Sequence, residues 1–277
     1  MQIITSTEQM QAQALRWRAE GKRIGFVPTM GFLHQGHASL MDIARPRCDV
    51  LVVSIFVNPT QFAPNEDLDR YPRDLAGDQR VCEEHGVDCV FAPTDGFYPP
   101  GHSTIVRVEG LSEGLCAGDR PTHFQGVSSV VARLFGVVQP SVAVFGEKDY
   151  QQLAILRRMV LDLAMPVEVV GGPLVREVDG LAMSSRNVNL SSEQRRRALS
   201  LSAALRGIAA AAAQGESDCA ALIAQAQAAV DCDKLEYLEI RDAHSLAPLQ
   251  TLDRPARAFI AARYGGTRLI DNLSVRD

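Results

Sequence analysis

The stretch Phe26-Val-Pro-Thr-Met-Gly-Phe-Leu-His-Gln-Gly-His37 decides the expected fold, because the chain changes there from a strand pattern to a helix pattern. Arg23–Val27 is short and apolar, as a buried strand is, and Ala38–Ala44 has the apolar spacing of a helix. We therefore predict a strand, a tight turn and a helix that begins close to the two histidines.

Two imidazoles at a predicted helix start indicate a site for an anion. The first N–H groups of a helix have no partner within the helix, and the helix dipole is positive at that end, so a phosphate is favoured there. His34 and His37 are three residues apart and could face one anion, while Gly36 allows a close backbone approach. Taken alone, the HxGH pattern is equally compatible with two surface or capping histidines.

Composition predicts an ordinary soluble protein. The 277 residues are 46% hydrophobic and 22% charged, and the net charge of -5 does not favour nucleic acid as a partner. The N-terminus lacks the pattern of a signal peptide, and the apolar runs fall well short of the roughly 20 residues of a membrane span. The six cysteines form no CxxC pair, so we expect reduced, structural thiols in a cytoplasmic protein without a membrane partner.

Strand and helix patterns alternate along the first part of the chain. Apolar runs rich in branched residues predict buried strands, and the intervening segments have helical spacing. This alternation predicts an α/β fold, a Rossmann-like, doubly wound and mostly parallel sheet. The expected strands lie at 23–27, 48–57, 87–91, 141–145 and 167–170, with a short edge strand at 103–109, and the expected helices at 9–20, 38–44, 75–85, 125–138 and 150–163.

A change of composition after Gly171-Gly172-Pro173 predicts a second domain. Two Ala-rich helices are expected at 191–214 and 218–230, followed by an alternating strand at 235–240. A hairpin should join 258–264 to 267–273 through Gly265-Gly266. We therefore expect a nucleotide-binding domain over residues 1–175 and a smaller α+β domain over 176–277.

Polar residues gather at the expected carboxyl ends of the strands, where open α/β sheets bind ligands. The segment 58–74 has no apolar period and supplies Asn58, Gln61, Asp67 and Tyr71. A lysine, Lys148, follows the strand 141–145 directly. From these patterns alone, each of these residues could equally be an ordinary surface residue.

Six segments together resemble the signature segments of the pantothenate synthetase family, the pantoate–β-alanine ligases. They occur in the order found in that family and cover nearly all of the first expected domain and the start of the second. The segments are Pro28–His37, Ser54–Phe62, Tyr71–Arg73, Arg120–Gly126, Phe145–Gln152 and Asp179–Asn187. HxGH alone is shared by a wider nucleotidyltransferase superfamily that includes class I aminoacyl-tRNA synthetases.

The resemblance implies an ATP-dependent ligase that joins pantoate to β-alanine through a pantoyl adenylate and releases diphosphate and AMP. It implies that His34 and His37 contact the ATP phosphates, with the residue at His37 as a proton donor. It also implies that Lys148 and Arg186 are catalytic. The implied ATP-binding residues are Met30, Gly31, Phe32, Leu33, His34, Gln35, Gly36, His37, Gly146, Glu147, Lys148, Asp149, Val175, Met183, Ser184, Ser185 and Arg186.

For the organic substrates, the resemblance implies Gln61 and Gln152 as ligands of pantoate, with Asn58 and Tyr71 as further contacts for pantoate and β-alanine. Mg²⁺ should be carried mainly by the oxygens of ATP. Asp78 occupies a position where the family often has an acidic metal contact, although Gly77 before it removes a paired carboxylate. The family is also dimeric, so a homodimer is expected.

Two other hypotheses about the function remain. An adenylyl- or cytidylyltransferase would share the histidine pattern, but it needs cations for a phosphate-bearing acceptor, and the candidate acceptor site here offers glutamines. A nucleotide-binding regulator without turnover is disfavoured by the presence of both histidines together with the lysine.

Overall fold

Two units, each with its own β-sheet, make up the computed structural model, which describes residues 1–63, 66, 68–94 and 96–277. The first unit consists of Met1–Glu113, Asp119–Glu147 and Gln152–Pro173. The second consists of Gly114–Gly118, Lys148–Gln151 and Leu174–Asp277. Two short segments from the first 175 residues, one of which contains Lys148, therefore belong to the second unit.

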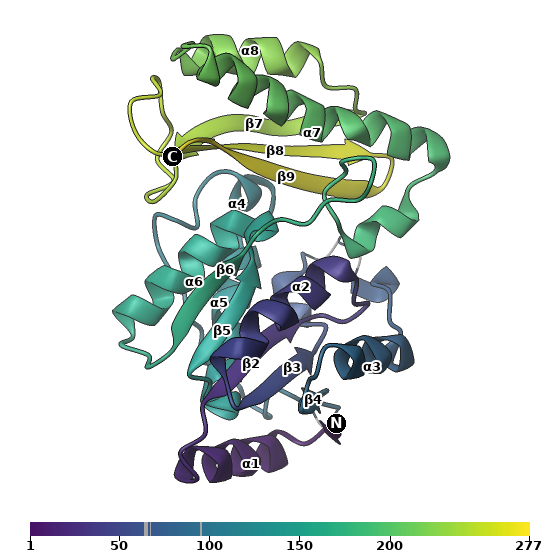
Figure 1. The fold of residues 1–277 in the computed structure, drawn as a ribbon, viewed down its shortest axis with the longest axis vertical. Coiled ribbons are helices and arrows are strands. Elements are labelled where there is room, and N and C mark those ends of the chain that lie inside the picture. The colour runs from purple at the N-terminus through teal and green to yellow at the C-terminus, as the bar shows by residue number, and fades with distance from the viewer. Residues whose placement is uncertain (64–65, 67, 95) are drawn as a thin grey trace. The chain divides into compact units, whose positions relative to one another are not determined.

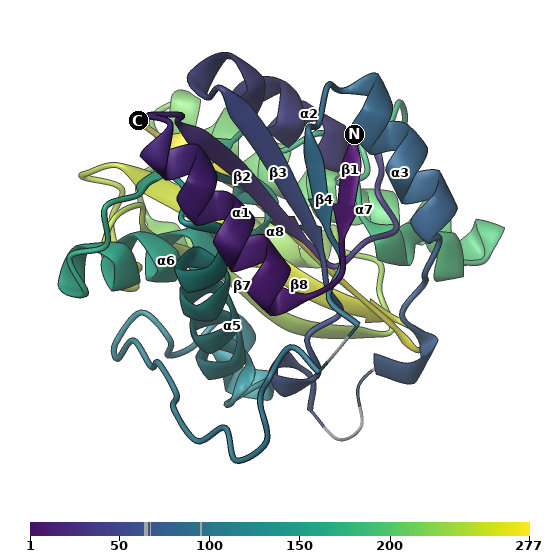
Figure 2. The same ribbon diagram turned by 90° about the horizontal axis from the view of Figure 1, so that it is seen from below.

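A parallel sheet with the strand order β1-β4-β3-β2-β5-β6 forms the centre of the first unit. Figure 2 shows β2, β3, β4 and β1 side by side in this order. The doubly wound, mostly parallel sheet predicted from the sequence is confirmed. Its strands are β1 (Gln2–Ile4), β2 (Ile24–Thr29), β3 (Val50–Ile55), β4 (Cys89–Phe91), β5 (Val142–Gly146) and β6 (Glu168–Gly172).

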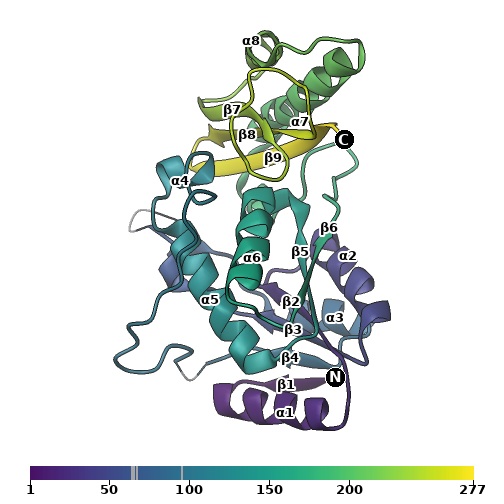
Figure 3. The same ribbon diagram turned by 90° about the vertical axis from the view of Figure 1, so that its left-hand side faces the viewer.

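Helices cover both faces of this sheet (Figures 1 and 3). Helices α2 and α3 pack together on one face, and α1 and α5 pack together on the other, which α6 also covers. These helices are α1 (Thr7–Ala19), α2 (Gln35–Ala44), α3 (Leu75–Glu84), α5 (His123–Val138) and α6 (Tyr150–Asp162), whereas the short α4 (Cys116–Asp119) falls mostly in the second unit. Short 3-10 helices occupy Arg45–Arg47 (η1), Pro59–Gln61 (η2), Leu68–Arg70 (η3) and Glu147–Asp149 (η4).

The strand order creates a switch point between β2 and β5. From β2 the chain moves outward to β3 and then to β4, and later returns to β5 on the other side of β2. Parallel strands place their carboxyl ends at one edge, so Thr29 and Gly146 end at the edge where open α/β sheets bind ligands.

Two local predictions failed in this unit. Strand β1 was missed because its three residues, Gln2–Ile4, are too few for a period to be recognised. The edge strand expected at 103–109 is wrong, since these residues form no ladder. The N–H of Val106 donates instead to the hydroxyl of Ser129 on α5 at 2.9 Å, so a side chain takes the bond that a neighbouring strand would take.

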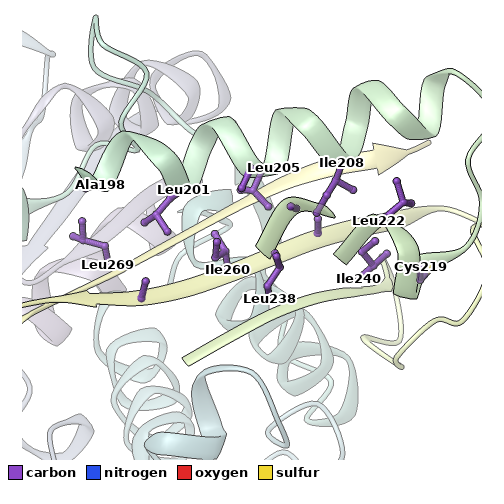
Figure 4. Close-up of a cluster of buried hydrophobic side chains, with 14 of the residues drawn as sticks. Ala198, Leu201, Leu205, Ile208, Cys219, Leu222, Leu238, Ile240, Ile260 and Leu269 are labelled. Carbon is purple, nitrogen blue, oxygen red and sulfur yellow. The ribbon is translucent and has the colours of Figure 1, made fainter. Parts of the chain in front are cut away.

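An antiparallel sheet is the centre of the second unit, as the sequence predicted, and its strand order is β7-β8-β9. Leu201, Leu205 and Ile208 of α7 point toward its strands (Figure 4). Gly265 turns the predicted hairpin with a φ of 58°. The elements are η5 (Ser185–Asn189), α7 (Ser192–Ala213), α8 (Cys219–Ala228), β7 (Lys234–Asp242), β8 (Ala256–Tyr264) and β9 (Thr267–Arg276).

No helix in the described part of the chain combines the length and the hydropathy that a membrane span needs.

Candidate active site

The two histidines cap the N-terminus of α2. His34 is the N-cap residue, and its Nδ1 accepts a hydrogen bond from the N–H of Gly36 at 3.1 Å. His37 reaches back, and its Nδ1 accepts from the N–H of His34 at 3.2 Å. An imidazole nitrogen that accepts carries no proton, so each neutral ring has its N–H at Nε2. The capping predicted as an alternative to function is therefore real, and it fixes the tautomer of each neutral ring as Nε2–H.

The turn between β2 and α2 has an unusual backbone. Gly31 has a φ of 83°, and Phe32 has a φ of 52°, in the left-handed region that side chains with a β-carbon rarely adopt. Such a conformation persists only where neighbouring groups hold it.

Asp78, on the first turn of α3, supplies that support. Its Oδ2 accepts from the N–H of Phe32 at 3.0 Å, and its Oδ1 accepts from the N–H of Leu33 at 2.6 Å. A β-carbon on Gly31 would lie 2.9 Å from Oδ2, so only glycine fits there. Burial raises the pKa of Asp78, and the hydrogen bonds from Leu33 and Phe32 oppose that shift. Both carboxylate oxygens thus hold backbone, and the metal contact expected at Asp78 stays a prediction.

Asn58, Gln61 and Met30 meet in the first unit. The amide of Gln61 donates through Nε2 to Sδ of Met30 and accepts at Oε1 from Nδ2 of Asn58, each at 3.1 Å. Asn58 is almost fully buried, and Tyr71 is buried with its ring against that of Phe62. Gln152 lies on the first turn of α6 and is partly buried. Asp67 of the same segment lies outside the described residues.

The chain leaves β5 at Gly146 and enters η4 with Glu147, Lys148 and Asp149. The ammonium of Lys148 lies 3.9 Å from Oδ2 of Asp149, too far for a short ion pair. In the second unit, the carbonyl of Lys148 accepts a hydrogen bond from Nδ2 of Asn272 on β9 at 2.9 Å, which fixes the backbone at the lysine.

The segment that carries Arg186 is anchored in the second unit. The N–H of Met183 donates to the carbonyl of Val175, and the hydroxyl of Ser184 caps η5 by accepting from the N–H of Arg186. Asn187 is buried and donates through Nδ2 to Glu177 at 2.6 Å and to the carbonyl of Ala182 at 3.0 Å.

Sequence reasoning missed three polar residues near Gln61. Arg120 and His123 both contact the carbonyl of Gln61, and Glu66 pairs with Arg120. Arg120 and His123 were within a segment quoted for the family resemblance, yet they received no role. Contacts across 54 to 62 residues of chain leave no local pattern that would have revealed them.

Comparisons with known proteins agree with one another. The family model described as pantoate-beta-alanine ligase matches residues 2–274. A pantothenate synthetase of Trichlorobacter lovleyi is 52% identical over 100% of this chain and 99% of its own length, and one of Pseudomonas putida is 52% identical over 99% and 97%.

Solved structures are similar over the same extent. The crystal structure of a pantothenate synthetase from Thermus thermophilus covers 100% of both chains with a TM-score of 0.95 and 48% identity. A pantoate-beta-alanine ligase from Francisella tularensis, complexed with beta-gamma ATP and beta-alanine, covers 99% of this chain and 98% of its own, with a TM-score of 0.81 and 33% identity. The chain therefore belongs to the pantoate–β-alanine ligase family, and it is an enzyme.

Proposed function

We propose that the enzyme condenses pantoate with β-alanine through a pantoyl adenylate. The observation that carries this proposal is the N-terminus of α2, where two imidazoles cap the helix through Nδ1 and carry their protons at Nε2, beside the positive end of the helix dipole. Helix α2 follows β2 at the switch point of the sheet, the usual ligand position in this architecture.

The chemistry needs activation of a poor electrophile. A carboxylate oxygen of pantoate attacks the α-phosphorus of ATP, the bond from that phosphorus to the bridging oxygen breaks, and diphosphate leaves. The amine of β-alanine then attacks the acyl carbon of the mixed anhydride, loses a proton and expels AMP. Negative charge grows on the phosphates in the first step, and fixed N–H donors stabilise it without reorganisation.

The roles proposed for the ATP-binding residues follow from the hydrogen-bond donors and charges that their side chains and backbone offer. The Nε2–H groups of His34 and His37 contact the phosphates, with His37 as the proton donor. Lys148 and Arg186 neutralise the β- and γ-phosphates and the leaving diphosphate, since a guanidinium presents five fixed donors. Further hydrogen bonds to ATP come from the hydroxyls of Ser184 and Ser185 and from the backbone of Met30, Gly31, Phe32, Leu33, Gln35 and Gly36. The adenosine part of ATP contacts Gly146, Glu147, Asp149, Val175 and Met183.

Gln61 and Gln152 bind the hydroxyls and the carboxylate of pantoate, because an amide both donates and accepts. Met30 contributes an apolar contact, and Asn58 and Tyr71 complete the site for pantoate and β-alanine. The relative from Francisella tularensis, described as complexed with beta-gamma ATP and beta-alanine, supports both as substrates.

Mg²⁺ enters as part of the Mg-ATP substrate, bound mainly by phosphate oxygens. Asp78 is its one candidate protein contact in this proposal, and its present hydrogen bonds to Phe32 and Leu33 would have to be shared with a hydrated ion. We further propose that the enzyme is a cytoplasmic homodimer whose partners are its small-molecule substrates, with neither nucleic acid nor membrane among them.

An AMP-release assay tests the function. The protein is incubated with Mg-ATP, pantoate and β-alanine, and AMP and pantothenate are measured with each organic substrate omitted in turn. We expect pantothenate and equimolar AMP only when both are present. Transfer of the nucleotide to a phosphate-bearing acceptor would support the nucleotidyltransferase alternative, and AMP release independent of both acids would exclude the ligase.

A further inference from the structure

Arg120 and Glu66 form an ion pair next to Gln61. Arg120 donates through Nε to Oε1 of Glu66 at 2.5 Å and through Nη2 to Oε2 at 2.8 Å, a two-point contact between largely buried side chains. Burial alone would raise the pKa of Glu66, but the hydrogen bonds and charge of Arg120 outweigh it and lower that pKa. Glu66 is therefore ionised at neutral pH and holds the guanidinium in one orientation.

The same guanidinium reaches the backbone of Gln61. Its Nη2 donates to the carbonyl of Gln61 at 3.3 Å, and its Nη1 lies 3.1 Å from Nε2 of His123. A guanidinium only donates, so Nε2 of His123 accepts. His123 is consequently neutral with its proton on Nδ1, and it donates that proton to the carbonyl of Gln61 at 2.9 Å. Arg120 and His123 thus both donate to the carbonyl of Gln61 and fix its position.

The side chain of Gln61 is oriented from the other side. Asn58 donates to its Oε1, which assigns the amide nitrogen to Met30. Asn58 is itself held, because Tyr98 donates to its Oδ1 at 2.9 Å and its Nδ2 also donates to the carbonyl of Gly126 at 3.2 Å.

We propose that Arg120, Glu66 and His123 are positioning residues for the acid substrate, acting through Gln61. The inference rests on the proposed function, in which Gln61 binds pantoate. A free glutamine samples several rotamers, and fixing it before binding lowers the ordering cost of the complex. Loss of the cluster should therefore weaken pantoate binding while leaving the ATP contacts of α2 intact.

The test compares His123→Asn with His123→Gln. The amide nitrogen of Asn can take the place of Nδ1 and donate to the carbonyl of Gln61, whereas the amide of Gln reaches the place of Nε2. We expect His123→Gln to raise KM for pantoate by roughly tenfold, the equivalent of one hydrogen bond, and His123→Asn by no more than about threefold. KM for ATP should stay within about twofold of wild type in both.

Arg120→Gln should raise KM for pantoate by at least as much as His123→Gln. Its matched control is Arg133→Gln on α5, since Arg133 donates to the carbonyl of Phe97 and not to that of Gln61. In a Gln61→Ala background, Arg120→Gln should have no further effect on KM for pantoate, because residues that act through one side chain are not additive.

Each outcome decides a separate point. A wild-type protein that makes no pantothenate overturns the proposed function. An active enzyme in which Gln61→Ala leaves KM for pantoate unchanged overturns the role of Gln61, and the inference with it. If Gln61→Ala raises that KM but Arg120→Gln and His123→Gln do not, or if they raise KM for ATP equally, the positioning role is overturned while the function stands.

Discussion

At the scale of residues, the site is built on side chains that hold backbone. Asp78 fixes the strained turn before α2, and His34 and His37 use Nδ1 to cap that helix. The same atoms decide which nitrogen of each imidazole carries the proton. The proposed phosphate contacts and the local fold therefore depend on the same hydrogen bonds.

Asp78→Asn tests the support of the turn. An amide offers one acceptor oxygen and turns its NH₂ toward the other N–H, so one backbone donor of the turn loses its partner, at a cost of about 1–3 kcal/mol. We expect turnover to fall by about 10- to 100-fold in the AMP-release assay. Asp42→Asn, at an exposed position on α2, should retain wild-type turnover. Unchanged turnover in Asp78→Asn would contradict this account of the turn.

His37→Ala and Lys148→Ala test the proposed charge stabilisation. Each removes one donor to the phosphates, and we expect kcat to fall by roughly 10²-fold or more. Lys22→Ala is the matched control for the lysine, because Lys22 pairs with Glu20 in an exposed position. Near wild-type rates in both site variants would remove the proposed catalytic centre.

At the scale of elements, α5 lies unusually close to η2, which carries Gln61. A β-carbon at Gly126 would come within 2.4 Å of the carbonyl oxygen of Thr60, and backbone cannot move aside as a side chain can. At Gly136 of the same helix, a β-carbon would have no neighbour within 4 Å. One helix therefore contains both a required and a replaceable glycine.

The pair Gly126→Ala and Gly136→Ala tests this close approach. Gly126→Ala should lower the free energy of unfolding by about 1–3 kcal/mol through overpacking, and by more if η2 is displaced. Gly136→Ala should raise it by about 0.5–1 kcal/mol, since alanine loses less backbone entropy in a helix. Urea titrations measure both. A stabilised Gly126→Ala would show that the two elements separate more easily than the structure indicates.

At the scale of the whole molecule, we expect the cysteines to be structural. All six are free thiols, and burial raises the pKa of Cys82 and of Cys89 to about 12. The thiolate is the reactive form, so these two should not react at neutral pH while the protein is folded.

Thiol labelling at pH 8 checks this expectation. In the native protein, Cys82 and Cys89 should remain unmodified, whereas all six thiols should react in denaturant. The partly exposed Cys48 and Cys232 are the internal comparison, and they should react before the buried pair. Modification of Cys82 at the rate of Cys232 would mean that the first unit opens readily.

The sequence by itself determined the elements whose signal is local. Runs of branched residues predicted the central strands, cap residues such as Ser191 predicted helix starts, and Gly265 predicted the hairpin of the second unit. It also determined the family, because six ordered segments are more specific than one histidine pair.

Tertiary structure decided what depends on residues far apart in the chain. The three-residue β1 exists because β4 pairs with it, and residues 103–109 form no ladder, with the N–H of Val106 bonded to Ser129 instead of to a strand. Asp78 meets Leu33 across 45 residues, and Arg120 meets Glu66 across 54. Local sequence patterns indicate backbone preference and burial. A hydrogen bond between distant residues forms only when the packing of the sheet and helices has brought its donor and acceptor together.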